Sequence, residues 1–156
     1  MAKQVKPIPE GYHSITPHLC VKGAANFAEF LKRAFGAVEL ARMPGPGGKI
    51  MHAEMRIGDS KLMFADEFPE FGNPVATEGH WPIEFHLYVP DADKAFAQAV
   101  AEGCKETMPI QDQFWGDRYG KVKDPFGFVW GIATHKEDLT PDEMKKRQEA
   151  AFSVKA

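Results

Sequence analysis

The chain has few cysteines and no long hydrophobic run. No window of its 156 residues approaches the roughly 20 consecutive apolar residues that a membrane-spanning helix needs, so we expect no membrane partner. Its two cysteines, Cys20 and Cys104, do not have the spacing of a metal site. Residues 1–10 contain no apolar signal segment, so we interpret both as reduced thiols and expect a cytoplasmic protein.

An excess of positive charge is also missing. The 19 Lys and Arg residues are outnumbered by 22 Asp and Glu residues, which gives a net charge of −3, and the basic residues do not cluster. Proteins that bind nucleic acid present a basic patch or stripe to the phosphates, so we expect no nucleic-acid partner. The apolar content of 44% and the charged content of 26% are ordinary for a globular protein.

What the sequence does contain is an internal repeat. The segment ITPHLCVKGA at 15–24 returns 68 positions later as IEFHLYVPDA at 83–92, with Ile, His, Leu, Val and Ala at matching places. Each copy leads into an amphipathic segment that ends at a glycine, Gly36 or Gly103. The repeat indicates two copies of one small α+β module. Because each copy is too short to bury a large core, we expect the two to stabilise each other within one domain, 1–156.

The periodicity predicts the order β-α-β-β-β in both copies. For the first module, 12–66, we predict strands at 14–21, 38–43, 49–57 and 61–65, a helix at 24–35 and a loop at 44–48. For the second, 82–136, we predict strands at 83–89, 105–108, 118–123 and 128–134, a helix at 92–102, a loop at 111–116 and a turn at 124–127. Residues 67–81 form a predicted linker, and a capping box from Thr140 to Glu143 opens a predicted C-terminal helix at 139–152.

Two such modules, with the turn Asp124-Pro125-Phe126-Gly127 before the last strand, resemble the vicinal oxygen chelate superfamily. This superfamily includes glyoxalase I, extradiol dioxygenases, and the fosfomycin and bleomycin resistance proteins. The runs MHAEMRIGD at 51–59 and DQFWGDR at 112–118 are most similar to its PhnB-like branch. The resemblance covers about 12–135. It implies an α+β fold whose modules form facing half-barrels around a cavity, and it implies a homodimer.

Strand alternation separates an apolar face from a polar face in each module. The predicted apolar faces, which we expect to pack under the helices, hold Met51, Ala53, Met55 and Ile57; Ile15, Leu19 and Val21; and Phe85, Leu87 and Val89. The opposite faces hold His52, Glu54 and Arg56; Thr16, His18 and Cys20; and Glu84, His86 and Tyr88. These polar residues either line one concave site or lie on a solvated sheet face.

The polar faces offer nitrogen and oxygen donors that would suit one divalent Zn, Ni, Mn or Fe ion. The hypothetical ligands are His18, His52, Glu54 and His86, with Glu54 and Glu84 as the catalytic carboxylates that move a proton. The resemblance, however, implies ligands on the first and last strands of each module. There this chain has Thr16 and Gly131, and no carboxylate within 61–65. A site without any metal is therefore an equal alternative.

An aromatic loop between two strands of the second module supplies further candidates. We predict that Phe114, Trp115, Arg118 and Tyr88 contact a ligand, with Arg118 clamping a carboxylate or phosphonate. In the alternative, the aromatic residues are core and Arg118 pairs with a nearby aspartate, Asp112 or Asp117. The chain is thus expected to bind a small molecule. It does so either as a metal-dependent lyase, isomerase or dioxygenase, or as a non-catalytic protein that sequesters a drug or metabolite without metal.

Overall fold

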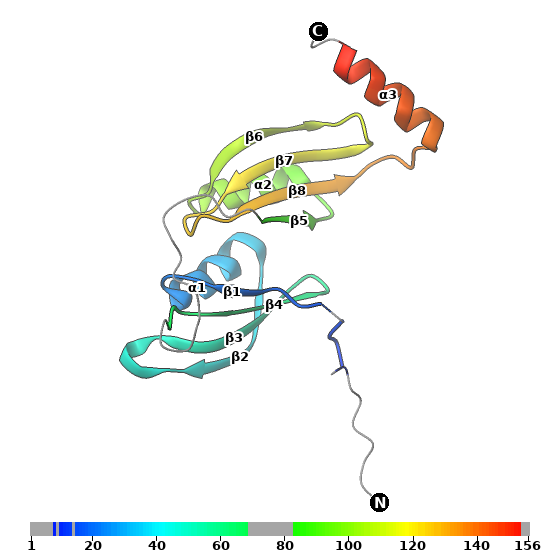
Figure 1. The fold of residues 1–156 in the computed structure, drawn as a ribbon. Coiled ribbons are helices and arrows are strands. Elements are labelled where there is room, and N and C mark those ends of the chain that lie inside the picture. Colours follow the sequence, from blue (N-terminus) through cyan, green and yellow to red (C-terminus); the bar gives the residue numbers. More distant parts are fainter. Residues whose placement is uncertain (1–7, 9, 14, 69–82, 154–156) are drawn as a thin grey trace, which may run out of the picture. The chain divides into compact units, whose positions relative to one another are not determined.

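Two compact units, residues 1–78 and 79–156, make up the chain. The computed structural model describes residues 8, 10–13, 15–68 and 83–153. Each unit contains one four-stranded sheet and a helix between its first two strands, and the second unit adds a C-terminal helix (Figure 1). The predicted α+β class, the two tandem βαβββ modules and the C-terminal helix are confirmed.

The two modules have the same topology. The first contains β1 (His18–Cys20), α1 (Ala24–Phe35), β2 (Val38–Pro44), a 3-10 turn (Pro46–Gly48), β3 (Ile50–Ile57) and β4 (Ser60–Ala65). The second contains β5 (Glu84–Tyr88), α2 (Ala92–Ala101), β6 (Lys105–Asp112), β7 (Asp117–Lys123) and β8 (Val129–His135), followed by α3 (Pro141–Ser153). The sheet orders are β1-β4-β3-β2 and β5-β8-β7-β6. In each, the first strand is parallel to the last and the other pairs are antiparallel.

The repeat seen in the sequence extends to the hydrogen bonds. The N–H of Val21 donates to the carbonyl of Ala65 at 2.9 Å, and the N–H of Val89 donates to the carbonyl of Ala133 at 2.8 Å. Both members of the second pair lie 68 positions after the members of the first. The histidines three residues before these valines therefore occupy equivalent places, as predicted.

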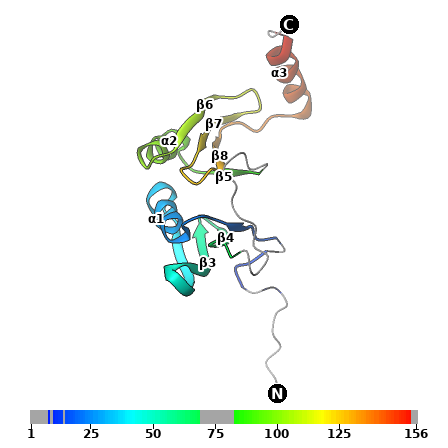
Figure 2. The ribbon, with the colours of Figure 1, turned by 60° about the vertical axis from the view of Figure 1, so that its left-hand side comes forward.

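One helix covers one face of each sheet (Figures 1 and 2). In α1 the buried residues include Phe27, Phe30 and Leu31, which recur at the spacing of a single helical stripe. The helix ends at Gly36, whose φ of 63° is the left-handed conformation that glycine adopts without strain. In α2 one phenylalanine, Phe96, is also buried.

In each module a residue at the end of the last strand, or directly after it, caps the helix. The buried carboxylate of Asp66 accepts the backbone N–H of Ala24 at 2.9 Å and that of Ile50 at 2.7 Å. At the equivalent place, 68 positions later, the hydroxyl of Thr134 accepts the N–H of Ala92 at 2.8 Å. The contacts to Ala24 and Ala92 satisfy helix N-terminal donors that have no partner within the helix.

Several predicted boundaries are wrong. Strand β1 begins at His18 rather than at 14, and Ile15 is 87% exposed instead of facing the helix. Pro17 has no N–H to donate to a ladder, which accounts for the late start. Strand β6 runs on to Asp112 because an edge strand with an irregular register tolerates Pro109.

The start of the predicted linker differs from the structure, whereas the start of the C-terminal helix agrees with it. Phe68, expected in the linker, is buried, whereas 69–81 lie outside the described residues. Helix α3 starts with the predicted capping box. The backbone N–H of Thr140 donates to the Glu143 carboxylate at 2.9 Å, and the N–H of Glu143 donates to the Thr140 hydroxyl at 3.3 Å. Of the helices in the described part of the chain, none is long and apolar enough to cross a membrane.

Candidate functional site

The sheet face opposite α1 carries a cluster of hydrogen-bonded polar side chains. His52 and Glu54 alternate along β3 with Ala53 and Met55, which are buried, so the predicted alternation of faces is confirmed here. His52 Nε2 lies 3.1 Å from one oxygen of Glu54. The hydroxyl of Tyr12 donates to the other Glu54 oxygen, a partner that the strand patterns did not reveal.

Two further contacts complete this first cluster. The ring of His18 stacks on that of His52, with centroids 5.6 Å apart and planes inclined by 26°. The ammonium of Lys61 lies 3.7 Å from the centroid of the Tyr12 ring. The cluster therefore joins β1, β3 and β4 to the segment before β1.

Hydrogen bonds and burial fix the protonation states in the first cluster. The hydroxyl of Tyr12, followed by the ring of His52, lowers the pKa of Glu54. The same Tyr12–Glu54 hydrogen bond raises the pKa of Tyr12 to about 12. Burial, and then the neighbouring His52, lowers the pKa of His18. At neutral pH Glu54 is thus an ionised acceptor, Tyr12 a donor and His18 a neutral ring.

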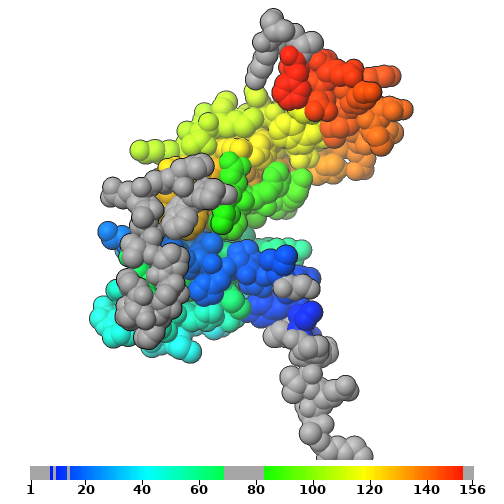
Figure 3. Space-filling model, viewed as in Figure 1, coloured from blue at the N-terminus to red at the C-terminus, as the bar shows by residue number. Residues whose placement is uncertain are grey.

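The corresponding face of the second module is aromatic. The rings of His86 and Tyr119 lie nearly parallel, 13° apart in plane and 5.4 Å apart between centroids. The ring centroids of Tyr88 and His86 are 4.7 Å apart. Both side chains project from β5 away from the core, and Tyr88 is 61% exposed. Strand β5, green in the space-filling view, accordingly reaches the surface (Figure 3). Beside this array, the ammonium of Lys121 is 2.8–2.9 Å from both oxygens of Glu84.

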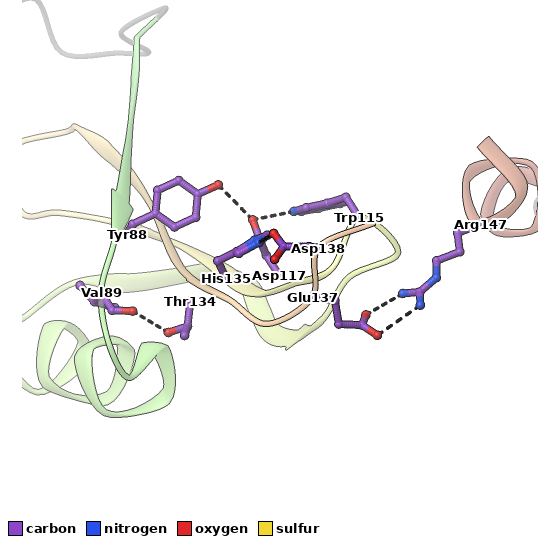
Figure 4. A network of polar contacts seen from close by, with 9 residues as sticks. All are labelled: Tyr88, Val89, Trp115, Asp117, Thr134, His135, Glu137, Asp138 and Arg147. Atoms are coloured by element: carbon purple, nitrogen blue, oxygen red, sulfur yellow. Dashed lines mark hydrogen bonds and ion pairs between the residues drawn. The ribbon is translucent and has the colours of Figure 1, made fainter. Parts of the chain in front are cut away.

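Asp117 is the polar centre of this second face (Figure 4). It is only 4% exposed. One carboxylate oxygen accepts both the hydroxyl of Tyr88 at 3.2 Å and the indole N–H of Trp115 at 3.1 Å. The other oxygen lies 2.9 Å from Nδ1 of His135, whose Nε2 is 2.9 Å from the Asp138 carboxylate.

The environment of Asp117 shifts the pKa values of its partners. The hydrogen bonds to Asp138 and then to Asp117 raise the pKa of His135, because the protonated ring donates to both carboxylates. Burial, then the negative charge of Asp117, raises the pKa of Tyr88. Tyr88 therefore stays a hydrogen-bond donor at neutral pH.

The turn between β6 and β7 places Trp115 beside these rings. Gly116 has a φ of 96°, and a Cβ atom on it would lie 2.8 Å from the carbonyl oxygen of Glu137. The carbonyl of Gly116 accepts the backbone N–H groups of Lys136 and Glu137, both at 3.0 Å. This interlocked turn sets the Trp115 ring edge-on to Tyr119, with centroids 5.5 Å apart.

Gly131 on β8 makes room for the Tyr119 ring. A Cβ atom at Gly131 would lie 2.7 Å from both Cε2 and the hydroxyl oxygen of Tyr119. This is the last-strand position at which the resemblance implies a carboxylate ligand. The equivalent residue of β4, by the 68-residue repeat and the strand registers, is Met63. Neither last strand thus supplies a metal ligand at this position.

Within each module, the remaining donors do not converge on one point. Within residues 8, 10–13, 15–68 and 83–153, no three His, Cys, Asp or Glu side chains are grouped so that they could hold one. The stacked rings of His18 and His52 have nearly parallel planes, so their nitrogen lone pairs do not converge. Both oxygens of Glu54 are engaged by neighbours, and both oxygens of Glu84 face an ammonium.

Two predicted ligand contacts have other partners. Arg118 forms a bidentate pair with Asp93 of α2, at 2.9 and 2.8 Å, and a longer contact of 3.4 Å with Asp112. Of the two aspartates predicted in the alternative, Asp112 makes only the longer contact, and the main partner, Asp93, was not predicted. Phe114 packs edge-on against Trp115 and against Phe152 of α3.

The sequence is similar to that of a known protein family. Residues 11–132 match the family model described as the Glyoxalase/Bleomycin resistance protein/Dioxygenase superfamily. The uncharacterized protein Mb0911c of Mycobacterium bovis is 39% identical over 149 residues, covering 93% of this chain and 94% of the relative.

Two solved structures share the fold. The crystal structure of TioX from Micromonospora sp. ML1 is 28% identical, with a TM-score of 0.65, over 80% of this chain and 99% of that one. The PhnB protein from Bacillus cereus has a TM-score of 0.63 over 78% of this chain and 99% of its own. At 16% identity, the PhnB protein shows likeness of fold alone.

Proposed function

The chain belongs to the glyoxalase/bleomycin resistance protein/dioxygenase superfamily, and from this premise we propose that it binds a small planar organic molecule. The proposed site is the polar face of the second module, and the observation that carries it is the parallel stack of His86 on Tyr119 with Tyr88 exposed beside it. Aromatic surfaces with a few fixed polar groups are typical of small-molecule sites.

The order of the rings explains why a planar ligand suits this face. Tyr119 is buried and lies over Gly131, whereas the rings of His86 and Tyr88 are open to solvent. A planar molecule laid against these two rings gains offset-stacking contacts, worth about 0.5–1.5 kcal/mol per aromatic pair beyond the area buried. The hydrogen bond to Asp117 holds Tyr88 in place, so little side-chain freedom is lost on binding.

The donor set supports binding without a resident metal. The last-strand positions carry Gly131 and Met63, and the first-strand positions carry Thr16 and a Glu84 that is paired with Lys121. A metal-dependent lyase, isomerase or dioxygenase would need other ligands than these. We therefore propose the non-catalytic alternative, in which the chain binds and sequesters a drug or metabolite.

Titration of the isotope-labelled full-length protein with quinoline, followed by amide and indole NMR, tests the proposal. We expect saturable shifts at His86, Tyr88 and the indole N–H of Trp115, the last assigned with the Trp115→Phe variant. Tyr88→Leu should weaken binding about two- to tenfold, whereas Phe152→Leu, an exposed aromatic outside the array, should not.

Two results would contradict the proposal. One is an absence of shifts on this face with quinoline and with other planar molecules of similar size. The other is a stoichiometric transition metal in protein purified without added metal or chelator, combined with loss of binding when that metal is removed.

A further inference from the structure

We infer that the ligand of the second module's polar face carries a positive charge, and that the rings around Asp117 accept a protonated or N-alkylated aromatic amine. This inference rests on the proposed function and names the class of ligand for the same site. It comes from the way in which four rings and one buried carboxylate are joined.

The four rings and the carboxylate form a closed chain of contacts. Trp115 is edge-on to Tyr119, Tyr119 is stacked on His86, and His86 is tilted against Tyr88, with centroid distances of 5.5, 5.4 and 4.7 Å. The chain closes at Asp117, where the Tyr88 hydroxyl and the Trp115 indole N–H meet on the same oxygen. The exposed ring of Tyr88 leaves a π-face that an ammonium group can contact.

The carboxylate makes two of these rings better acceptors of a cation. Both Tyr88 and Trp115 donate their polar hydrogen to the negative charge of Asp117, which polarises the ring electrons toward the π-faces. The faces of tyrosine and tryptophan are already negative because of the ring quadrupole. A cation beside them is attracted by the ring faces and by the aspartate behind them.

The other charges near the face leave it negative. The ammonium of Lys121 offsets the carboxylate of Glu84. Asp117 and Asp138 then face at most the single positive charge of His135, which bridges them. An anionic ligand would therefore be repelled where a cationic ligand is attracted.

Three probes of similar shape and different charge test the inference on the full-length protein. They are the N-methylquinolinium cation, neutral quinoline and the naphthalene-1-sulfonate anion, each titrated at pH 7.5 with the Trp115 indole resonance as reporter. We expect the cation to bind at least about threefold tighter than quinoline, and the anion to bind most weakly. Added salt should weaken the binding of the cation more than the binding of quinoline.

Variants separate charge from shape. Asp117→Asn keeps the size of the side chain and should reduce the preference for the cation over quinoline. Tyr88→Leu, at an exposed position, keeps an apolar surface but removes a π-face. It should therefore weaken the binding of the cation more than the binding of quinoline. This second variant decides the question if Asp117→Asn does not fold. Phe152→Leu is the matched control and should change neither affinity.

The outcomes distinguish the two proposals. If quinoline and the cation bind equally, or if the anion binds tightest, the charge inference is overturned while the proposed function stands. If none of the three probes shifts the resonances of this face, the proposed function is overturned as well. A preference for the cation that is unchanged in both Asp117→Asn and Tyr88→Leu would also overturn the assignment to these residues.

Discussion

Among single residues, Asp66 makes contacts that hold the first module's helix to its sheet. Its carboxylate is buried and accepts three backbone N–H groups, from Gly23, Ala24 and Ile50. Asp66→Ala leaves these donors without an acceptor, so we expect a loss of about 2–4 kcal/mol in the free energy of unfolding. Urea denaturation would measure it. The exposed Asp59→Ala is the control, and a loss equal to that control would contradict the role of Asp66.

His135 makes part of the stability depend on pH. Its pKa is raised in the folded protein, so its contribution is fully present below the unfolded value of about 6.5 and is lost as the pH rises through the folded pKa. We expect the difference in melting temperature between the wild type and His135→Gln to shrink as the pH rises through this window. His13→Gln serves as a control at an exposed position. A difference that grows with pH would show that the protonated ring of His135 does not stabilise the folded protein through Asp117 and Asp138.

Residue patterns predicted which side chains share a face, but not which of them meet. Alternation along a strand is local, so it placed His52 with Glu54, and His86 with Tyr88, on the polar faces. The contact of Asp117 with Tyr88 joins positions 29 apart, and that of Tyr12 with Glu54 joins positions 42 apart. Such contacts depend on strand register and loop path, which no short window of sequence contains.

At the scale of elements, a glycine on β8 leaves room for a ring carried by the neighbouring strand β7. Gly131→Ala would place a methyl group 2.7 Å from Tyr119, so we expect a loss of about 1–3 kcal/mol and displacement of the ring from His86. Tyr119→Leu should remove most of this cost, which a double-mutant cycle in urea would show as strong coupling. Additive losses would mean that the two residues do not compete for the same space.

The helices should contribute to stability through their buried phenylalanines. Phe30 in α1 and Phe96 in α2 are 2% and 6% exposed, so truncation of either to Ala should cost about 3–5 kcal/mol. Phe152→Ala in α3, where the side chain is 58% exposed, should cost far less. Chemical denaturation of the three variants is the measurement, and a loss under about 1 kcal/mol at Phe30 or Phe96 would contradict the predicted stripes.

Elements differed in how well the sequence specified them. Helix α1 has the predicted bounds, since an apolar stripe and a left-handed glycine mark its course and its end. Strand β6 was predicted four residues too short because Pro109 suggests a break, and only its place at the sheet edge permits it. Whether a strand lies at the edge or in the centre is a property of the assembled sheet, and a short window of sequence does not contain it.

For the whole molecule, the repeat preserves one feature of the polar face and reverses another. By register, His52 is equivalent to Tyr119, and each ring stacks on the repeated histidine of its module, His18 or His86. Glu54, however, is equivalent to Lys121. The two modules thus share a scaffold and a ring stack, but differ in charge. The cavity implied by the resemblance stays a prediction.

The predicted homodimer can be tested at a defined surface. Edge strand β2 exposes Val38, Leu40 and Met43 by 46%, 42% and 57%, and exposed apolar side chains on a sheet edge are typical of surfaces that pair with another chain. Light scattering after size exclusion should give about 35 kDa, twice the chain mass of 17.4 kDa. Leu40→Lys should shift the protein toward the monomer. Val100→Lys, at a similarly exposed position on α2, should leave the dimer intact. A monomeric wild type, or a Leu40→Lys variant with the mass of a dimer, would exclude β2 as the interface.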